Sequence, residues 1–501
     1  MVDHAPCGRV QGGGTEISAE NLARSLKVNL HMRRPSVLLP VVVAGWLILT
    51  GLPFDGGSVL QAQAPAAGVE VASSPTSAGG AASASGADEG RDWRQVLPGV
   101  TLGAQMRLRT ERRRNFRFDD TQSGNDEGFL LSRFRLGLTW EPNDSVTGVV
   151  ELQDARIFGE TAISETRAPN IFADQLDFHQ AYLDVRAPDA APVPLAVRAG
   201  RIKLSYGAQR LISPLEWVNT ARVFDGVELT LGEGGRTVSA FASRLVPVTP
   251  AGINDHRPTP NRMFNSQLHG IYAADDGLVP GAAVEAYWLL RREARMGDAV
   301  HTAGARVDAV FGPWRIDGEA ARQTGRYGGS PHRALMVHVG GSFTTALPGR
   351  PRIGAAFNAG SGDDDPGDGV HGTFDNLYPL NHVYYGYMDL FALQNLRNVE
   401  VSVETALPGQ SSLRVAWHDF ALAAPGTDAW YNAGAGVVHR AVGADISSDV
   451  GSEIDITLRV PLRQISLEMG YGRFIGGAYL RDADFKLRSA DFFYLQTVVG
   501  F

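Results

Sequence analysis

The chain ends in Asp491-Phe-Phe-Tyr-Leu-Gln-Thr-Val-Val-Gly-Phe501, in which successive side chains alternate as they do along a β-strand. Phe493 and Leu495 share one face with the terminal Phe501, and Tyr494 and Gln496 share the other. A chain that stops on a strand with a terminal aromatic residue is unusual for a soluble protein, but the closing strand of a bacterial outer-membrane barrel ends in this way. We therefore expect this strand to pair with the first strand of a closed barrel.

The same period-2 alternation recurs from about residue 100 onward, and helical periodicity does not. In the first such segment Leu102, Met106 and Leu108 face one way, while Gln105 and Arg107 face the other. An aliphatic face opposite a charged face is what a lipid-facing wall around a water-filled lumen requires. The pattern predicts strands at 100–110, 129–140, 146–156, 175–185, 195–204, 223–231, 236–245, 265–274, 282–291, 303–312, 314–323, 335–344, 351–359, 397–405, 411–420, 451–460, 464–473 and 492–501.

The connections between these strands are of two alternating kinds. Some are tight turns with Gly, Pro and Asn in turn positions, such as Glu141-Pro-Asn-Asp144 and Leu347-Pro-Gly-Arg350. Others are long, such as 205–222 and 360–396. Outer-membrane barrels have short periplasmic turns and long extracellular loops. The predicted fold is all-β: a single-chain transmembrane antiparallel β-barrel of about 18 strands, with both ends of the barrel segment on the periplasmic side.

The composition is compatible with this fold. The 501 residues carry a formal charge of -8, and 44% are hydrophobic. A helical membrane protein needs apolar runs of about 20 residues, and only one stretch, near the N-terminus, approaches that length. A barrel needs only every second residue to be apolar, so its average hydropathy looks ordinary. The sole cysteine, Cys7, precedes the apolar stretch, which leaves no disulfide in the mature chain.

The N-terminal region has the layout of a secretory signal peptide. Basic Met32-Arg-Arg34 precedes an apolar run from Val37 to Leu52, and Ala62-Gln-Ala64 offers a cleavage site. Cleavage after Ala66 is an alternative, and a short transmembrane anchor is the alternative to export. The expected division is 1–31 (an extension upstream of the true start at Met32), 32–66 (signal peptide), 67–98 (a disordered linker rich in Ala, Ser and Gly) and 99–501 (barrel).

Three stretches resemble signatures of the alginate export family. The first is Gly200-Arg-Ile-Lys-Leu-Ser-Tyr-Gly-Ala-Gln-Arg-Leu-Ile-Ser-Pro-Leu-Glu-Trp217, followed by Asn219-Thr220 and Phe224-Asp-Gly226. The second is Ser361-Gly-Asp-Asp-Asp-Pro366, continuing through Gly372-Thr-Phe-Asp375, Leu377-Tyr-Pro379 and Gly386-Tyr-Met-Asp389 to Asn395. The third is Gly451-Ser-Glu-Ile-Asp455 with Gly470-Tyr-Gly-Arg-Phe474 and Ala483-Asp-Phe485. With the strand pattern, the resemblance covers roughly residues 100–501. It implies a monomeric outer-membrane barrel of eighteen strands. The best-known member of that family passes alginate, an anionic polyuronate, through an arginine-lined lumen.

Alternation also predicts which basic side chains point into the lumen. On the strands these are Arg107, Arg109, Arg133, Arg135, Arg306, Arg352, Arg414 and Arg459. The first resembling stretch and its continuation add Arg201, Lys203, Arg210 and Arg222, whose direction the pattern does not fix. Guanidinium groups stay charged and bind carboxylates through two parallel hydrogen bonds. Because acids such as Glu151 and Asp455 also point inward, two alternatives stand: an anion-selective constriction of unpaired arginines, or a ladder of paired structural groups.

One acidic loop is a candidate calcium site. Asp363, Asp364, Asp365 and Asp368 lie in a Gly-rich stretch, and Ca²⁺ prefers several oxygen ligands in a flexible loop. The spacing matches an EF-hand poorly, so a solvated acidic loop is the alternative. We expect no other cofactor.

These observations lead to an expected function. We expect an outer-membrane channel for passive, ATP-independent passage of an anionic or polar solute, an alginate-like polysaccharide or its fragments; both export and uptake fit. The chain has no Gly-x-Ser-x-Gly, His-Glu-x-x-His or phosphate-binding loop, so we expect no catalytic residues and no enzyme activity. The alternatives are a structural or adhesive barrel plugged by 205–222 and 360–396, or an outer-membrane hydrolase.

The expected partners follow from the location. They are outer-membrane lipid and lipopolysaccharide, the solute itself, and the barrel-assembly machinery that reads the strand ending at Phe501. We expect a monomer that does not bind nucleic acid.

Overall fold

The computed structural model describes residues 94–119, 121, 125–159, 171–188, 193–248, 266–293 and 296–500. The expected extension 1–31, the signal peptide 32–66 and nearly all of the linker 67–98 lie outside the described residues, as does Phe501. Those expectations therefore stay predictions. No helix among the described residues is long and apolar enough to cross a membrane.

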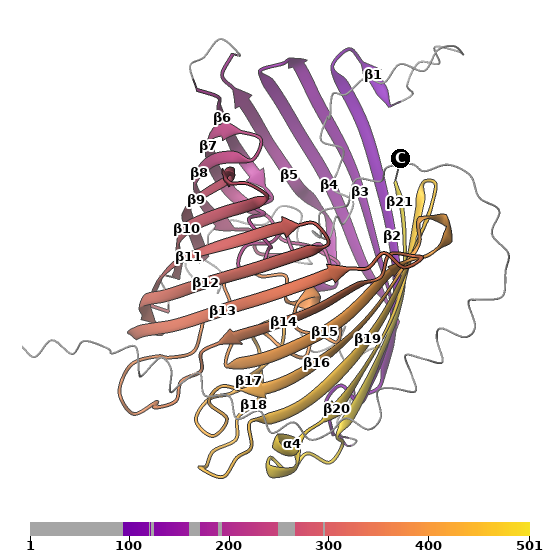
Figure 1. The fold of residues 1–501 in the computed structure, drawn as a ribbon. Helices are drawn as coiled ribbons and strands as arrows, with labels where there is room; N and C mark the ends of the chain where they lie inside the picture. Colours follow the sequence, from indigo (N-terminus) through magenta and orange to yellow (C-terminus); the bar gives the residue numbers. More distant parts are fainter. Residues whose placement is uncertain are drawn as a thin grey trace, which may run out of the picture. The chain divides into compact units, whose positions relative to one another are not determined.

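Eighteen strands follow one another around a closed ring, each antiparallel to its neighbours (Figure 1). Three of the described strands lie outside the ring: β1 (Gln95–Leu97) pairs with β2, and β17 (Trp430–Tyr431) pairs with β18 (Val437–His439). The ring consists of β2 (Val100–Arg114), β3 (Glu127–Asn143), β4 (Val146–Phe158), β5 (Asp174–Arg186), β6 (Leu195–Ile202), β7 (Phe224–Glu233), β8 (Arg236–Leu245), β9 (Ser266–Val279), β10 (Ala282–Glu293), β11 (Asp298–Phe311), β12 (Trp314–Tyr327), β13 (Ser330–Thr344), β14 (Arg352–Gly360), β15 (Leu396–Ala406), β16 (Ser412–Leu422), β19 (Asp449–Leu462), β20 (Ile465–Gly476) and β21 (Ser489–Gly500).

The ring closes as the C-terminal pattern predicts. β21 pairs with β2 from Arg114 opposite Asp491 to Gln105 opposite Gly500. Closure leaves no unpaired strand edge, and the hydrocarbon core of a membrane offers no water to pair one with. The predicted fold, a single-chain transmembrane antiparallel barrel of eighteen strands, is confirmed.

The predicted strands match the eighteen of the ring, although several continue further at one end. β2 extends to Arg114 where 110 was expected, and β13 begins at Ser330 where 335 was expected. At these additional strand residues the outward side chains are also charged, as at Arg112 and Arg333. The difference in polarity between the outward and inward side chains therefore disappears before the strand pairing ends, and alternation underestimates the strand length.

The two faces of the wall are those that alternation assigns. Arg107 on the lumen side is only 3% exposed, whereas its neighbour Leu108 on the outer side is 41% exposed. The short turns gather at one end of the barrel, where β21 also ends, and the long loops gather at the other. We call these the turn end and the loop end. At the loop end, only the connections from β10 to β11 and from β12 to β13 are short.

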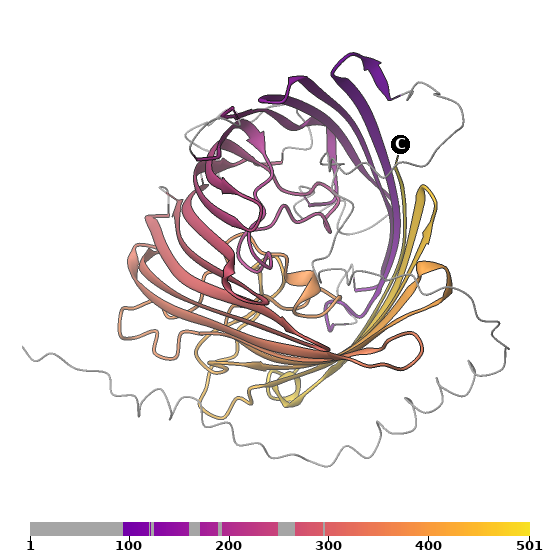
Figure 2. The same cartoon turned by 45° about the horizontal axis from the view of Figure 1, so that its top comes forward.

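Two long loops fold back into the barrel. They are residues 203–223, between β6 and β7, and residues 361–395, between β14 and β15; we call them segments A and B. Figure 2, which turns the top of the barrel toward the viewer, shows pink and orange segments inside the ring of strands. Segment B contributes a 3-10 helix, η2 (Asn381–Val383), and side chains such as Tyr385 and Leu393 that are fully buried. Loop-end elements such as α4 (Ala478–Asp482) add to this apolar interior.

Candidate functional site

Segments A and B pair with each other and form one body inside the barrel. The backbone N–H of Ser213 donates to the carbonyl of Tyr378 at 2.8 Å, and the N–H of Tyr378 donates to the carbonyl of Leu211 at 2.9 Å. The N–H of Leu380 donates to the carbonyl of Gln209 at 2.9 Å. We call this body the plug.

Four of the predicted lumen arginines meet at segment A. The Arg107 guanidinium donates to the backbone carbonyls of Glu216 at 2.8 Å and Val218 at 3.1 Å. Arg109 donates to the carbonyl of Trp217 at 2.6 Å. From β3, Arg133 and Arg135 approach the Glu216 carboxylate at 3.0 and 2.9 Å. Buried cations require hydrogen-bond partners, and here the plug supplies them.

The Glu216 carboxylate is the centre of this cluster. Lys203 also reaches it, with its Nζ 2.9 Å from Oε1. Burial alone would raise the pKa of Glu216, but the charges of Arg135, Lys203 and Arg133 outweigh burial and hold that pKa well below its usual range. Glu216 is therefore a fixed negative charge among fixed positive ones. This arrangement anchors segment A to the wall formed by β2 and β3.

An aromatic stack joins the two segments at the same level. The rings of Trp217 and His382 lie 3.6 Å apart and nearly parallel, and Tyr387 continues the stack at 4.6 Å from His382. The Arg109 guanidinium covers the other face of Trp217 at 3.9 Å. Asp389 accepts a hydrogen bond from Trp217 Nε1 at 2.9 Å and lies 3.2 Å from His382 Nδ1. The stack thus ties segment A, segment B and β2 together.

Segment B is anchored to β19 through two buried carboxyl groups. The backbone N–H of Met388 donates to Glu453 at 2.9 Å, and that of Tyr387 donates to Asp455 at 3.1 Å. Glu453 and Asp455 are 0% and 1% exposed. Gly386 has a φ of +86°, and a Cβ there would lie 2.5 Å from a carboxylate oxygen of Glu453. A side chain there would be strained by the positive φ and would require the Glu453 carboxylate to shift.

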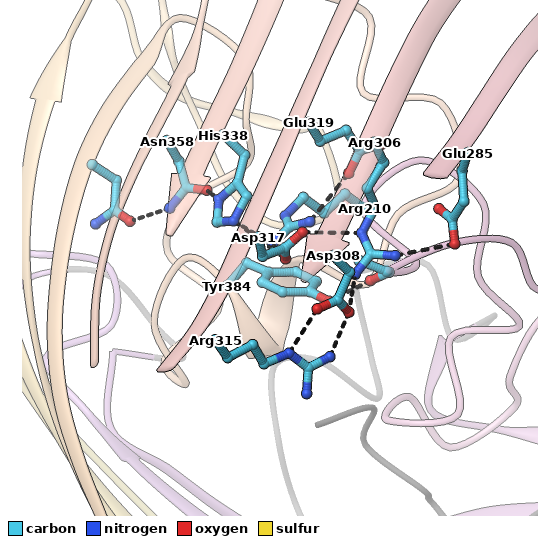
Figure 3. A network of polar contacts seen from close by, with 12 residues as sticks. Arg210, Glu285, Arg306, Asp308, Arg315, Asp317, Glu319, His338, Asn358 and Tyr384 are labelled. Atoms are coloured by element: carbon cyan, nitrogen blue, oxygen red, sulfur yellow. Dashed lines mark hydrogen bonds and ion pairs between the residues drawn. The ribbon is translucent and has the colours of Figure 1, made fainter. Parts of the chain in front are cut away.

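On the opposite wall, segment A enters a network of charged side chains (Figure 3). Arg210 lies 2.8 Å from Asp317 and 3.1 Å from Glu319, both on β12. Arg306 on β11 contacts Asp317 at 3.1 Å and Glu285 at 3.1 Å. The predicted lumen residue Arg306 and the signature residue Arg210 therefore share an acidic partner.

All but one of the other predicted basic residues have an acid beside them. Arg352 pairs with Glu404, and Arg414 pairs with Glu400. Arg459 lies 2.7 Å from Glu468. Arg201 lies 2.8 Å from Asp225, but this pair is on the outer face, because Asp225 alternates in phase with the exposed Val227 and Leu229 of β7. The lumen wall therefore carries ion pairs at Arg352, Arg414 and Arg459.

Arg222 differs from these residues. It lines a cavity of about 970 Å³ at the loop end, together with plug, wall and loop residues. Its guanidinium donates to the carbonyls of Ser213 at 3.2 Å and Pro379 at 3.5 Å and lies 5.4 Å from the centre of the Tyr378 ring. No carboxylate pairs with it among the described residues. Burial lowers the pKa of Arg222 to about 10, so the group stays charged at neutral pH.

The candidate calcium loop satisfies its own backbone. Asp365 accepts from the N–H of Gly367 at 3.1 Å, and Asp368 accepts from the N–H of Val370 at 2.6 Å. Asp364 is exposed, and the N–H of Asp363 donates to Asp428 at 3.0 Å. Among the described residues, no three His, Cys, Asp or Glu side chains gather closely enough to hold a metal ion. Calcium binding here stays a prediction.

Sequence reasoning did not identify the residues that hold the plug. Glu216, Trp217, His382 and Asp389 were not candidates, because their partners are backbone carbonyls and side chains from distant segments. One signal was present: Trp217 and Asp389 lie in the first and second family-like stretches, and the two residues bond to each other.

Known proteins resemble this chain in fold and in family. Among solved structures, outer-membrane proteins of Pseudomonas aeruginosa superpose on it: OccK3 (OpdO), with a TM-score of 0.52, 14% identity and coverage of 80% of this chain and 95% of that one, and OccK2 (OpdF) in complex with glucuronate, with a TM-score of 0.51, 12% identity and coverage of 81% and 98%. No curated protein sequence matches significantly.

The sequence family is the stronger evidence. The family model described as alginate export matches residues 99–492. Together with the porin-like barrel, this match makes the protein an outer-membrane channel. The chain belongs to the alginate export family.

Proposed function

We propose that this channel passes an anionic solute, an alginate-like polysaccharide or its fragments, passively and without ATP. The observation that carries the proposal is Arg222, a guanidinium without an acidic partner that faces the loop-end cavity of about 970 Å³. A guanidinium in such a setting attracts carboxylates, because low-dielectric walls concentrate its field. Uronate units present one carboxylate each and can pair with it bidentately.

The plug determines how the solute reaches the turn end. Segment A occupies the arginines of β2 and β3, and its acceptors there are carbonyl oxygens and the Glu216 carboxylate. The carboxylates of a polyuronate have the same chemistry as these acceptors. We propose that carboxylates of the incoming chain replace the oxygen atoms of segment A as the hydrogen-bond acceptors of Arg107, Arg133 and Arg135. The solute would thereby displace the plug from these arginines.

A plugged structural barrel is the second candidate. It is favoured by the number of buried charged contacts between plug and wall, such as Arg210 with Glu319 at 3.1 Å. The two candidates differ in one property: a structural barrel conducts no ions when the plug is loosened.

Current block by oligouronates in planar bilayers tests the proposal. The full-length mature protein and a plug-loosened Trp217→Ala variant would be exposed to di- and tetraguluronate, with neutral cello-oligosaccharides of equal length as the control. The proposal predicts concentration-dependent block by the uronates that weakens in Arg222→Gln. Equal block by the neutral sugars, or no block at all, would contradict it. Glucuronate, which one of the superposing barrels holds, is a suitable monomeric probe.

A further inference from the structure

A band of arginines lies on the outer face of the barrel at the loop end. Its members are Arg292 on β10, Arg322 and Arg326 on β12, and Arg333 on β13; we call it the basic band. The strand registers place them in adjacent rows. Ala299 pairs with both Arg292 and Arg326, and Arg333 pairs with Thr324 on β12.

The band is exposed and free of acids. Arg292, Arg322, Arg326 and Arg333 are all exposed, and no carboxylate pairs with them in the part of the chain that the structure describes. From β9 to β13 the rows that hold these arginines are otherwise filled by Gln267, His269, Leu290, His301, Thr324 and similar residues. Like charges gathered without counter-charges disfavour one another, so anions bound from outside the chain would stabilise the band.

The position of the band indicates which anions. Directly below it on the same strands lie outward apolar side chains, among them Trp288, Leu335 and Val339. Trp288 stands in the row of Arg322, since both pair with Ala303. An exposed tryptophan at the border of an apolar wall marks the membrane interface. The arginines therefore lie at the level of lipid headgroups, at the end of the barrel with the long loops, which in outer-membrane barrels faces outward.

We infer that the basic band binds the phosphate groups of a phosphorylated glycolipid of the outer leaflet, of the lipopolysaccharide type. Neighbouring strands lie roughly 4.8 Å apart, so Arg292 and Arg326, two strands apart, stand about 10 Å from each other and can hold one phosphate between them. The planar guanidinium pairs phosphate oxygens bidentately. The connections from β10 to β11 and from β12 to β13 are short, so no long loop from these strands covers the arginines. The inference does not depend on what passes through the lumen.

Binding of purified lipid A to the delipidated mature barrel in detergent tests the inference, with native mass spectrometry as the readout. The test variant replaces Arg292, Arg322, Arg326 and Arg333 by Gln. Because each cation near an anionic headgroup contributes appreciably, we expect bisphosphorylated lipid A to bind this variant at least about tenfold more weakly than the unaltered barrel. The double variant Arg322→Gln with Arg333→Gln should be intermediate and guards against a folding defect in the fourfold variant.

The matched control replaces four exposed arginines of the turn end, Arg186, Arg236, Arg350 and Arg463, by Gln. Its affinity should stay within about twofold, and the fully dephosphorylated lipid should not distinguish any of the barrels. Equal loss in both fourfold variants would overturn the inference. So would displacement of the lipid by millimolar inorganic phosphate, which would identify free phosphate as the ligand, or a second copy of the chain bound in place of lipid.

Discussion

The indole of Trp217 and the imidazole of His382 stack at 3.6 Å, although one comes from segment A and the other from segment B. Asp389 binds both rings from the side, at 2.9 Å from Trp217 Nε1 and 3.2 Å from His382 Nδ1. The pair sits where the β2 arginines and the β19 carboxyl groups approach the plug from two sides. The Trp217–His382 pair therefore links the contacts of segment A with β2 to those of segment B with β19. Removing the stack should weaken both sets of contacts.

Replacing Trp217 by Ala should free the plug while leaving the barrel folded. The change removes the stack on His382, the cover over Arg109 and the bond to Asp389, which together are worth roughly 3 kcal/mol of docking free energy. Hydrogen exchange should accelerate in 203–223 and 361–395 but not in β2 or β21. Trp314 on the outer wall is the control, because its replacement by Ala touches no plug residue. Unchanged exchange in Trp217→Ala would show that the stack does not hold the plug.

Glu216→Gln should weaken the anchor on β2 and β3. Removing one partner of a buried ion cluster costs about 3–5 kcal/mol, because Arg133, Arg135 and Lys203 lose their counter-charge. We expect a higher open probability in planar bilayers than for the unaltered channel. Glu233→Gln, at an exposed residue of the turn end, should behave like the unaltered channel. An open probability equal to that control would mean that the carbonyl contacts alone suffice.

The same carboxylate should make the plug sensitive to acid. The pKa of Glu216 is lowered in the docked plug, so docking gains stability from its charge at pH values above the ordinary pKa of about 4.3 and loses that stability as the pH falls toward the lowered pKa. Conductance should stay constant from neutral pH to about pH 5 and rise only in stronger acid. In Glu216→Gln this rise should be absent. A rise that persists in the variant would assign the effect to another group.

Gly386→Ala should undock segment B. The new Cβ would meet the Glu453 carboxylate at 2.5 Å, on a backbone with φ of +86°. Gly369 offers a matched control in the same segment, since its φ is +76° and nothing lies within 4 Å of a Cβ placed there. Both changes carry the backbone cost of alanine at positive φ, roughly 1 kcal/mol. Faster hydrogen exchange around Tyr387 and Met388 should appear only in Gly386→Ala. Equal effects would attribute the role of Gly386 to backbone strain alone.

The sequence predicted the wall well and the plug poorly, for a physical reason. The alternation of polar and apolar residues indicates only whether each side chain faces the lipid or the lumen. This is enough to place all eighteen strands and to orient Arg107 and Arg133 inward. It does not record what fills the lumen. Arg107 uses the carbonyls of segment A as acceptors, and carbonyls have no sequence signature. The direction of Arg210 and Arg222 likewise depends on how segments A and B pair across more than a hundred residues.

The proposal that an anion passes through this lumen is tested most directly by the reversal potential of the mature channel across a KCl gradient. The account predicts a preference for chloride in the unaltered channel and in plug-loosened Trp217→Ala, and a smaller preference in Arg222→Gln. The variant Arg292→Gln on the outer wall should retain the full preference. A preference for potassium, or no current even after residues 361–395 are removed, would contradict the account.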